Sequence, residues 1–187
     1  YIFLSFLFCI LSVCLNGLAW KNIIIWFGQN SKKNNLISFY ILTNSLKYVP
    51  GGVWHFVERF TFLKERFNRE LAFYVNLIEP YFMLSASLLS TSLGVIYNPL
   101  FLLFVLPSIF LHRNLIYIII IKLQSFKDKS KRIFKMNYTK SQFDEKIKIK
   151  SSFPFRILSI ELFFILFKFL GFIFSFKIFN DLSNLDY

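Results

Sequence analysis

Apolar residues dominate three long runs of this 187-residue chain, and polar residues gather between them. Residues 1–20 hold no charge, and as a helix rising about 1.5 Å per residue they would cross a bilayer core about 30 Å thick. Residues 71–111 form a run of 41 with one charge, Glu79, which is long enough for a hairpin of two helices. A third run begins near Phe155. The pattern predicts an all-α, polytopic membrane helix bundle.

We expect a single transmembrane domain over residues 1–187, with about four spans near residues 2–26, 70–96, 99–112 and 155–179. A broken or re-entrant helix pair is predicted at about 36–63. Residues 36–46 carry no charge and give about 16 Å of helix, half a bilayer, before Pro50-Gly51-Gly52 breaks the helix. This segment either folds back as a re-entrant hairpin, which we favour, or crosses the membrane as a broken helix.

Basic residues set the expected orientation. The formal net charge is +12, and eleven of the 22 Lys and Arg residues fall between positions 113 and 150, in a predicted basic cytoplasmic loop over about 113–153. A second basic cluster follows the helix break, whereas the turn at 97–99 is uncharged. The positive-inside rule therefore places both basic stretches in the cytoplasm and the turn outside.

The basic loop is interpreted first as a topology determinant, and alternatively as a surface for anionic lipid. It carries no nucleic-acid motif, so no nucleic-acid partner is expected. Two histidines, far apart in sequence, and Cys9 and Cys14 in the first span give no metal-ligand spacing. We predict neither a metal nor a cofactor.

The segment 47–59 carries the candidate chemistry. Non-helical backbone at membrane depth is tolerated only where protein or a wet cavity satisfies it. A helix restarting after Gly52 would point its free N–H groups at the break, and Lys47 and Arg59 would add charges that suit a lipid phosphate. The alternative is a tight connection with Trp54 as an interfacial anchor. The candidate lipid-binding residues are Lys47, Tyr48, Pro50, Gly51, Gly52, Trp54, His55, Arg59 and Glu79.

Three further charges lie inside apolar runs. Glu79, directly before Pro80, is expected to face the bundle interior and to pair with Lys47 or Arg59. Glu161 and Lys168 are seven residues apart, on one helix face, and each is expected to pair with another helix. Lys168 is alternatively a structural counter-charge.

A family resemblance rests on residues 42–55, which include Lys47-Tyr48-Val49-Pro50-Gly51-Gly52-Val53-Trp54-His55, and on residues 76–83 and 153–172. These stretches resemble the transmembrane, flippase-type domain of the lysylphosphatidylglycerol synthetase family, in the short bacterial and cyanobacterial members without the aminoacyl-transferase domain. The resemblance implies an inner-membrane protein with inverted-repeat character that binds or moves phospholipids. Family members carry a second Pro-Gly-Gly segment, which is absent here, so the chain is expected to be a fragment. The resemblance also implies an Arg at the position of Lys168.

The expected function is the binding and, in the complete protein, the translocation of an anionic phospholipid or lipid-linked headgroup in a bacterial cytoplasmic membrane. The expected partners are that lipid and either a second copy or the remainder of the same domain. One alternative is a membrane-embedded enzyme that uses His55 and Glu58 on a lipid-linked substrate, although we predict no enzymatic activity. The other is a structural or assembly subunit without a substrate.

Overall fold

The computed structural model describes residues 1–29, 35–122 and 149–183. Helices and turns make up these residues, and no strand occurs among them, so the predicted all-α class is confirmed. In chain order the elements are α1 (Ile2–Trp26), α2 (Leu36–Asn44), the 3₁₀ helix η1 (Ser45–Tyr48), α3 (Trp54–Arg66), α4 (Arg69–Ser92), η2 (Leu93–Ile96), η3 (Pro99–Val105), α5 (Leu106–Ile109), a helix at Arg113–Lys122, and α7 (Phe155–Ser183).

Three helices in the described part of the chain are long and apolar enough to span a membrane: Ile2–Trp26, Arg69–Ser92 and Phe155–Phe179. They lie where the hydrophobic runs place them. The span predicted at 99–112 has a different form, because Pro99–Ile109 and Arg113–Lys122 meet at a bend of 64° and make a fourth span only if they are counted together. Fourteen residues of helix would reach only about 21 Å, so this segment alone is too short to cross.

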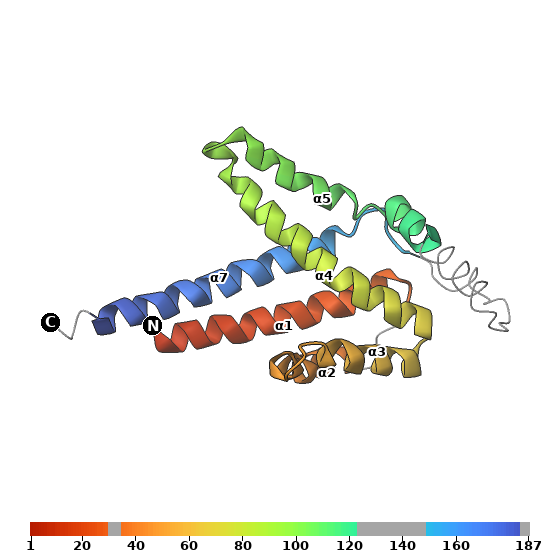
Figure 1. Cartoon of the computed structure of the whole chain (residues 1–187), viewed down its shortest axis with the longest axis horizontal. Helices are drawn as coiled ribbons and strands as arrows, with labels where there is room; N and C mark the ends of the chain where they lie inside the picture. Colours follow the sequence, from red (N-terminus) through yellow and green to blue (C-terminus); the bar gives the residue numbers. More distant parts are fainter. Residues whose placement is uncertain (30–34, 123–148, 184–187) are drawn as a thin grey trace.

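Helices α1 and α7 run antiparallel, so that the start of α1 and the end of α7 lie at the same end of the molecule (Figure 1). Close contact is possible because small residues line the seam: the Ser5 hydroxyl donates to the Gly171 carbonyl at 3.0 Å. A Cβ at Gly171 would lie 3.2 Å from the Cys9 Sγ. The outward faces are apolar and exposed, with Phe3 74% and Phe172 65% accessible, as expected of surfaces that meet lipid.

The end of α1 is fixed by backbone geometry. Gly28 adopts a positive φ of 84°, its N–H donates to the Ile25 carbonyl, and the Gln29 N–H donates to the Ile24 carbonyl. This is the Schellman arrangement, which glycine favours because it has no Cβ. The Trp26 carbonyl and indole N–H then hold the segment before α7, through the Lys150 N–H and the Ser151 carbonyl.

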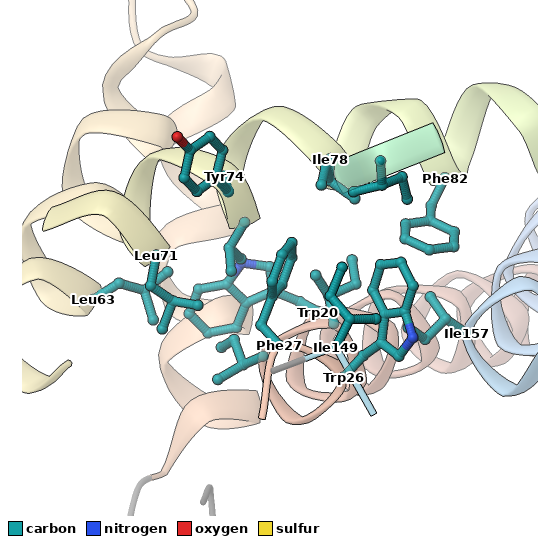
Figure 2. Packing of buried hydrophobic residues seen from close by; sticks show 14 of the residues in the cluster. Trp20, Trp26, Phe27, Leu63, Leu71, Tyr74, Ile78, Phe82, Ile149 and Ile157 are labelled. Atoms are coloured by element: carbon teal, nitrogen blue, oxygen red, sulfur yellow. The ribbon is translucent and has the colours of Figure 1, made fainter. Parts of the chain in front are cut away.

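The apolar core lies where α4 crosses this end of α1 (Figure 2). Trp20, Ile23 and Phe27 from α1 are fully buried, and the Trp26 ring meets the Phe82 ring of α4 edge-on at 5.9 Å between centroids. Asn68 caps the start of α4, since its Oδ1 accepts from the Leu71 N–H at 2.6 Å. Six of the described helices contribute residues to this core, whereas the distal half of α1 packs mainly on α7.

The pair α2 and α3 folds back on itself. The Phe39 and Phe62 rings stack at 3.8 Å between centroids, and the Arg59 Nε donates to the Thr43 Oγ1 at 3.1 Å. From the first contact to the second, the contacting residue advances by four on α2, from Phe39 to Thr43, and goes back by three on α3, from Phe62 to Arg59. The two helices are therefore antiparallel. Between them Gly51 and Gly52 take positive φ values of 98° and 63°, which glycine adopts without steric cost. These contacts favour the hairpin over the crossing helix.

Lys32, Lys33 and most of the basic loop lie outside the described residues.

The hairpin predicts that both of its ends emerge on one side of the membrane. In a background with Cys9 and Cys14 replaced by Ser, cysteines at Asn35 and Glu65 should react with an impermeant maleimide from the same side of sealed vesicles. A cysteine at Tyr97, in the turn after α4, should react from the opposite side. Labelling of positions 35 and 65 from opposite sides would show that the segment crosses the membrane.

Candidate functional site

A buried ion pair joins the returning arm of the hairpin to α4. The Arg59 Nη1 donates to the Glu79 Oε1 at 2.8 Å, and the side chains are 0% and 3% exposed. Glu79 is the eleventh of the 24 residues of α4, near the middle of that span. The sequence left Lys47 and Arg59 as candidate partners of Glu79, and the structure selects Arg59. An unpaired charge at this depth would cost several kcal/mol, which the pairing offsets.

Two residues of α2 complete this arrangement. The Tyr40 hydroxyl donates to the same Glu79 Oε1 at 2.7 Å, and the Arg59 guanidinium lies 3.6 Å above the Tyr40 ring centroid. Thr43 accepts from the Arg59 Nε. Sequence reasoning missed Tyr40 and Thr43, although their spacing with Lys47 (i, i+3, i+7) places all three on one helix face. Arg59, Glu79, Tyr40, Thr43 and Lys47 are called the charged layer below, together with Glu161 and Lys168.

Helix α1 approaches this layer through a glycine. A Cβ at Gly17 would lie 3.3 Å from a Tyr40 ring carbon and 3.4 Å from the Ile37 Cγ2. The absent side chain allows α2 to lie against α1, and the Trp20 and Tyr40 ring centroids are 5.6 Å apart. Helix α1 therefore lies directly against the Tyr40 side of the layer.

The remaining charges of the layer come from η1 and α7. Lys47 is half-buried and interacts electrostatically with Arg59, Glu79, Lys168 and Glu161. Lys168 is exposed, and its Nζ lies 5.6 Å from the Phe164 ring centroid. Glu161 is 0% exposed, and neither carboxyl oxygen has a hydrogen-bond partner in the part of the chain that the structure describes. The pairing of Glu161 with another helix, expected from the sequence, is therefore not a direct hydrogen bond.

The helix break lies at the exposed tip of the hairpin. Tyr48 is 89% exposed, Pro50, Gly51 and Gly52 are exposed, and Trp54 is half-exposed. The Trp54 indole N–H donates to the Pro50 carbonyl at 2.9 Å, which closes the turn. No side chain caps the first turn of α3. Its backbone donors are therefore oriented toward the tip, where a ligand could approach.

His55 and Glu58 lie in different environments. His55 is 6% exposed and packs on Phe56, with ring centroids 4.0 Å apart, whereas Glu58 is exposed on the outside of α3. The two side chains do not line a common cavity in this structure. In the described residues no group of three or more His, Cys, Asp and Glu side chains could hold a metal ion.

A shallow apolar groove of about 380 Å³ runs along the outside of the hairpin where α3 meets α4. It begins beside the first turn of α3 and is lined by Phe56, Val57, Phe60, Phe73, Asn76 and Leu77. The groove and the hairpin tip are thus adjacent.

Comparisons with protein-family models, curated proteins and solved structures find no match for this chain. Its class follows from the fold alone. The chain is a multi-pass α-helical membrane protein in which a helical hairpin and three long spans contribute to or contact the charged layer.

The ion pair should show strong energetic coupling. Glu79→Leu leaves the Arg59 cation buried, and Arg59→Met leaves the Glu79 carboxylate buried, so each should lower the free energy of unfolding by about 3–5 kcal/mol. The double variant Arg59→Met/Glu79→Leu should lose less than either single variant, because no unpaired charge remains. Chemical unfolding in detergent micelles measures this. Additive losses would show that the pair does not act as a unit.

Proposed function

We propose that this protein binds an anionic phospholipid or lipid-linked headgroup at the hairpin tip and, in the complete protein, moves it across the membrane. The observation that carries the proposal is the charged layer. Charged side chains are rare within spans, because each costs free energy in hydrocarbon, and they mark substrate paths when they gather. Three of these charges are cations, Lys47, Arg59 and Lys168, against the carboxylates Glu79 and Glu161, so the layer attracts anions.

Lys47 is the cation best placed to meet a phosphate. It follows α2 on η1, three residues before the break, and its ammonium is half-buried rather than enclosed. The uncapped first turn of α3 adds backbone donors and the positive end of the helix dipole. Arg59, which the sequence suggested as a second phosphate ligand, uses its Nη1 and Nε on Glu79 and Thr43. Its role in the proposal is to hold the hairpin in place, with the unpartnered Nη2 as its remaining donor.

The groove between α3 and α4 supports a lipid rather than a water-soluble anion. Five of its six lining residues are aromatic or aliphatic, the sixth being Asn76, and it starts beside the turn that holds Pro50 and Trp54. An acyl chain in this groove would place the headgroup near Lys47. Trp54, half-exposed at the tip, suits the boundary between headgroups and hydrocarbon.

The resemblance of the Lys47–His55 stretch to the flippase-type domain of lysylphosphatidylglycerol synthetases agrees with this function and with a bacterial cytoplasmic membrane. Discontinuous helices near bound headgroups are a recurring device of transporters built from inverted repeats. A second repeat in the complete protein would provide the other half of the path.

Removing the Lys47 charge should weaken lipid binding. Lys47→Gln should reduce the affinity for phosphatidylglycerol in mixed micelles by about three- to tenfold, a loss of about 0.7–1.4 kcal/mol, and leave affinity for a zwitterionic lipid unchanged. The matched control is Lys64→Gln, which removes an exposed charge at the other end of α3. Native mass spectrometry or fluorescence titration measures both. Equal losses of affinity in the two variants would show that the effect comes from the net charge of the protein and not from a site at Lys47.

Filling the groove should weaken binding through the acyl chain. Leu77→Trp places a larger ring in the groove, whereas Leu84→Trp adds the same ring to an exposed position of α4 that does not line it. Only Leu77→Trp should lower the affinity for long-chain phosphatidylglycerol, and short-chain analogues should be less affected. An unchanged affinity in Leu77→Trp would place the acyl chain elsewhere.

A further inference from the structure

Glu161 is the least explained charge of the protein. It lies on the second turn of α7, its side chain is fully buried, and both carboxyl oxygens lack a hydrogen-bond partner among the described residues. The other carboxylate of the charged layer, Glu79, is paired, since its Oε1 accepts from both Arg59 and Tyr40. A bare carboxylate in such a place would carry the full cost of burying a charge, whereas the neutral acid would not.

The groups that face Glu161 come from every element packed around it. Electrostatic interactions link its carboxyl to Lys47 of η1 and Glu79 of α4, and also to Tyr40 of α2. Arg59 on α3 forms an ion pair with Glu79, which in turn interacts with Glu161. Lys168 lies on the same face of α7 as Glu161.

We infer that Glu161 is a proton-binding site within the membrane, where the carboxyl takes up a proton from the aqueous phase and releases it as the charge around it changes. The proton forms an O–H bond with one carboxyl oxygen, and the side chain changes from one negative charge to none. The carboxyl needs no other ligand. Glu79 differs from Glu161 in its contacts, because its Oε1 accepts from the Arg59 Nη1 at 2.8 Å and from the Tyr40 hydroxyl at 2.7 Å.

Proton uptake by Glu161 changes the charge that a lipid phosphate would meet. With both carboxylates ionised, the three cations of the layer leave a net charge of one positive unit, and with Glu161 protonated they leave two. Protonation therefore favours the anion, and by linkage a bound anion favours the proton. This second step rests on the proposed lipid-binding function, whereas the proton site itself does not.

The proton site is tested by infrared difference spectroscopy of the protein in lipid nanodiscs near neutral pH. We expect the spectrum of wild type minus Glu161→Gln to contain the carbonyl stretch of a protonated carboxylic acid in an apolar site. Glu161→Asp, which retains the carboxylic acid, should shift the frequency of this band. This variant provides the test if Glu161→Gln does not fold. Glu58→Gln, at an exposed position of α3, is the control that should leave the band unchanged.

A difference spectrum that contains the paired stretches of an ionised carboxylate would overturn the inference. It would show that Glu161 is charged and is balanced by a cation, whether Lys47 or a bound metal ion. A Na⁺-dependent change of the same bands would identify the metal ion. Either result stands regardless of whether the protein binds lipid.

The coupling is tested by titrating phosphatidylglycerol at two pH values on either side of neutrality. Affinity should rise by roughly tenfold toward the acidic value, the effect of one unit charge about 10 Å away at an effective dielectric constant of about 20. Glu161→Gln should abolish the pH dependence. His55→Gln should retain it, which separates Glu161 from the one histidine near the layer.

Loss of the pH dependence in His55→Gln instead would assign the titration to the histidine and overturn the coupling. Absence of lipid binding at both pH values would refute the proposed function, while the infrared result would still decide whether Glu161 carries a proton.

Discussion

The ion pair between Arg59 and Glu79 connects two parts of the chain that have few other reasons to meet. Arg59 lies on the returning arm of a hairpin, and Glu79 lies midway along a span. In a membrane the hydrophobic effect gives helices no drive to associate, because lipid is as apolar as their side chains. Charges that cannot remain in hydrocarbon alone supply that drive, and Tyr40 and Thr43 bring α2 into the same contact.

Polar residues thus organise one end of the bundle, and apolar packing organises the rest. Trp20 links the two, since it is buried in the core and also lies against the Tyr40 ring. The hairpin tip, by contrast, is exposed and closed only by local contacts such as the Trp54–Pro50 hydrogen bond. The proposed lipid-binding site combines this exposed tip with the buried ion pair beside it.

The hydrophobic pattern was sufficient for the three long spans, because length and apolar content alone decide whether a helix can cross a bilayer. It was insufficient near residues 99–112, where Pro99–Ile109 and Arg113–Lys122 meet at a bend of 64° instead of forming one straight span. Among the candidate site residues, the sequence limited the partner of Glu79 to Lys47 or Arg59 but did not decide between them. The contributions of Tyr40 and Thr43 were missed, because neutral side chains in an apolar run resemble ordinary packing residues.

The amino-acid sequence by itself determined the membrane class, the place of the helix break at Pro50-Gly51-Gly52, and the presence of charges within the spans. These depend on composition and on residues adjacent in the chain. Only the tertiary structure decided that the broken segment folds back, that Arg59 rather than Lys47 pairs with Glu79, and that Glu161 is enclosed without a partner. Those outcomes depend on which faces of distant helices meet, and that geometry is set by the packing of the whole bundle.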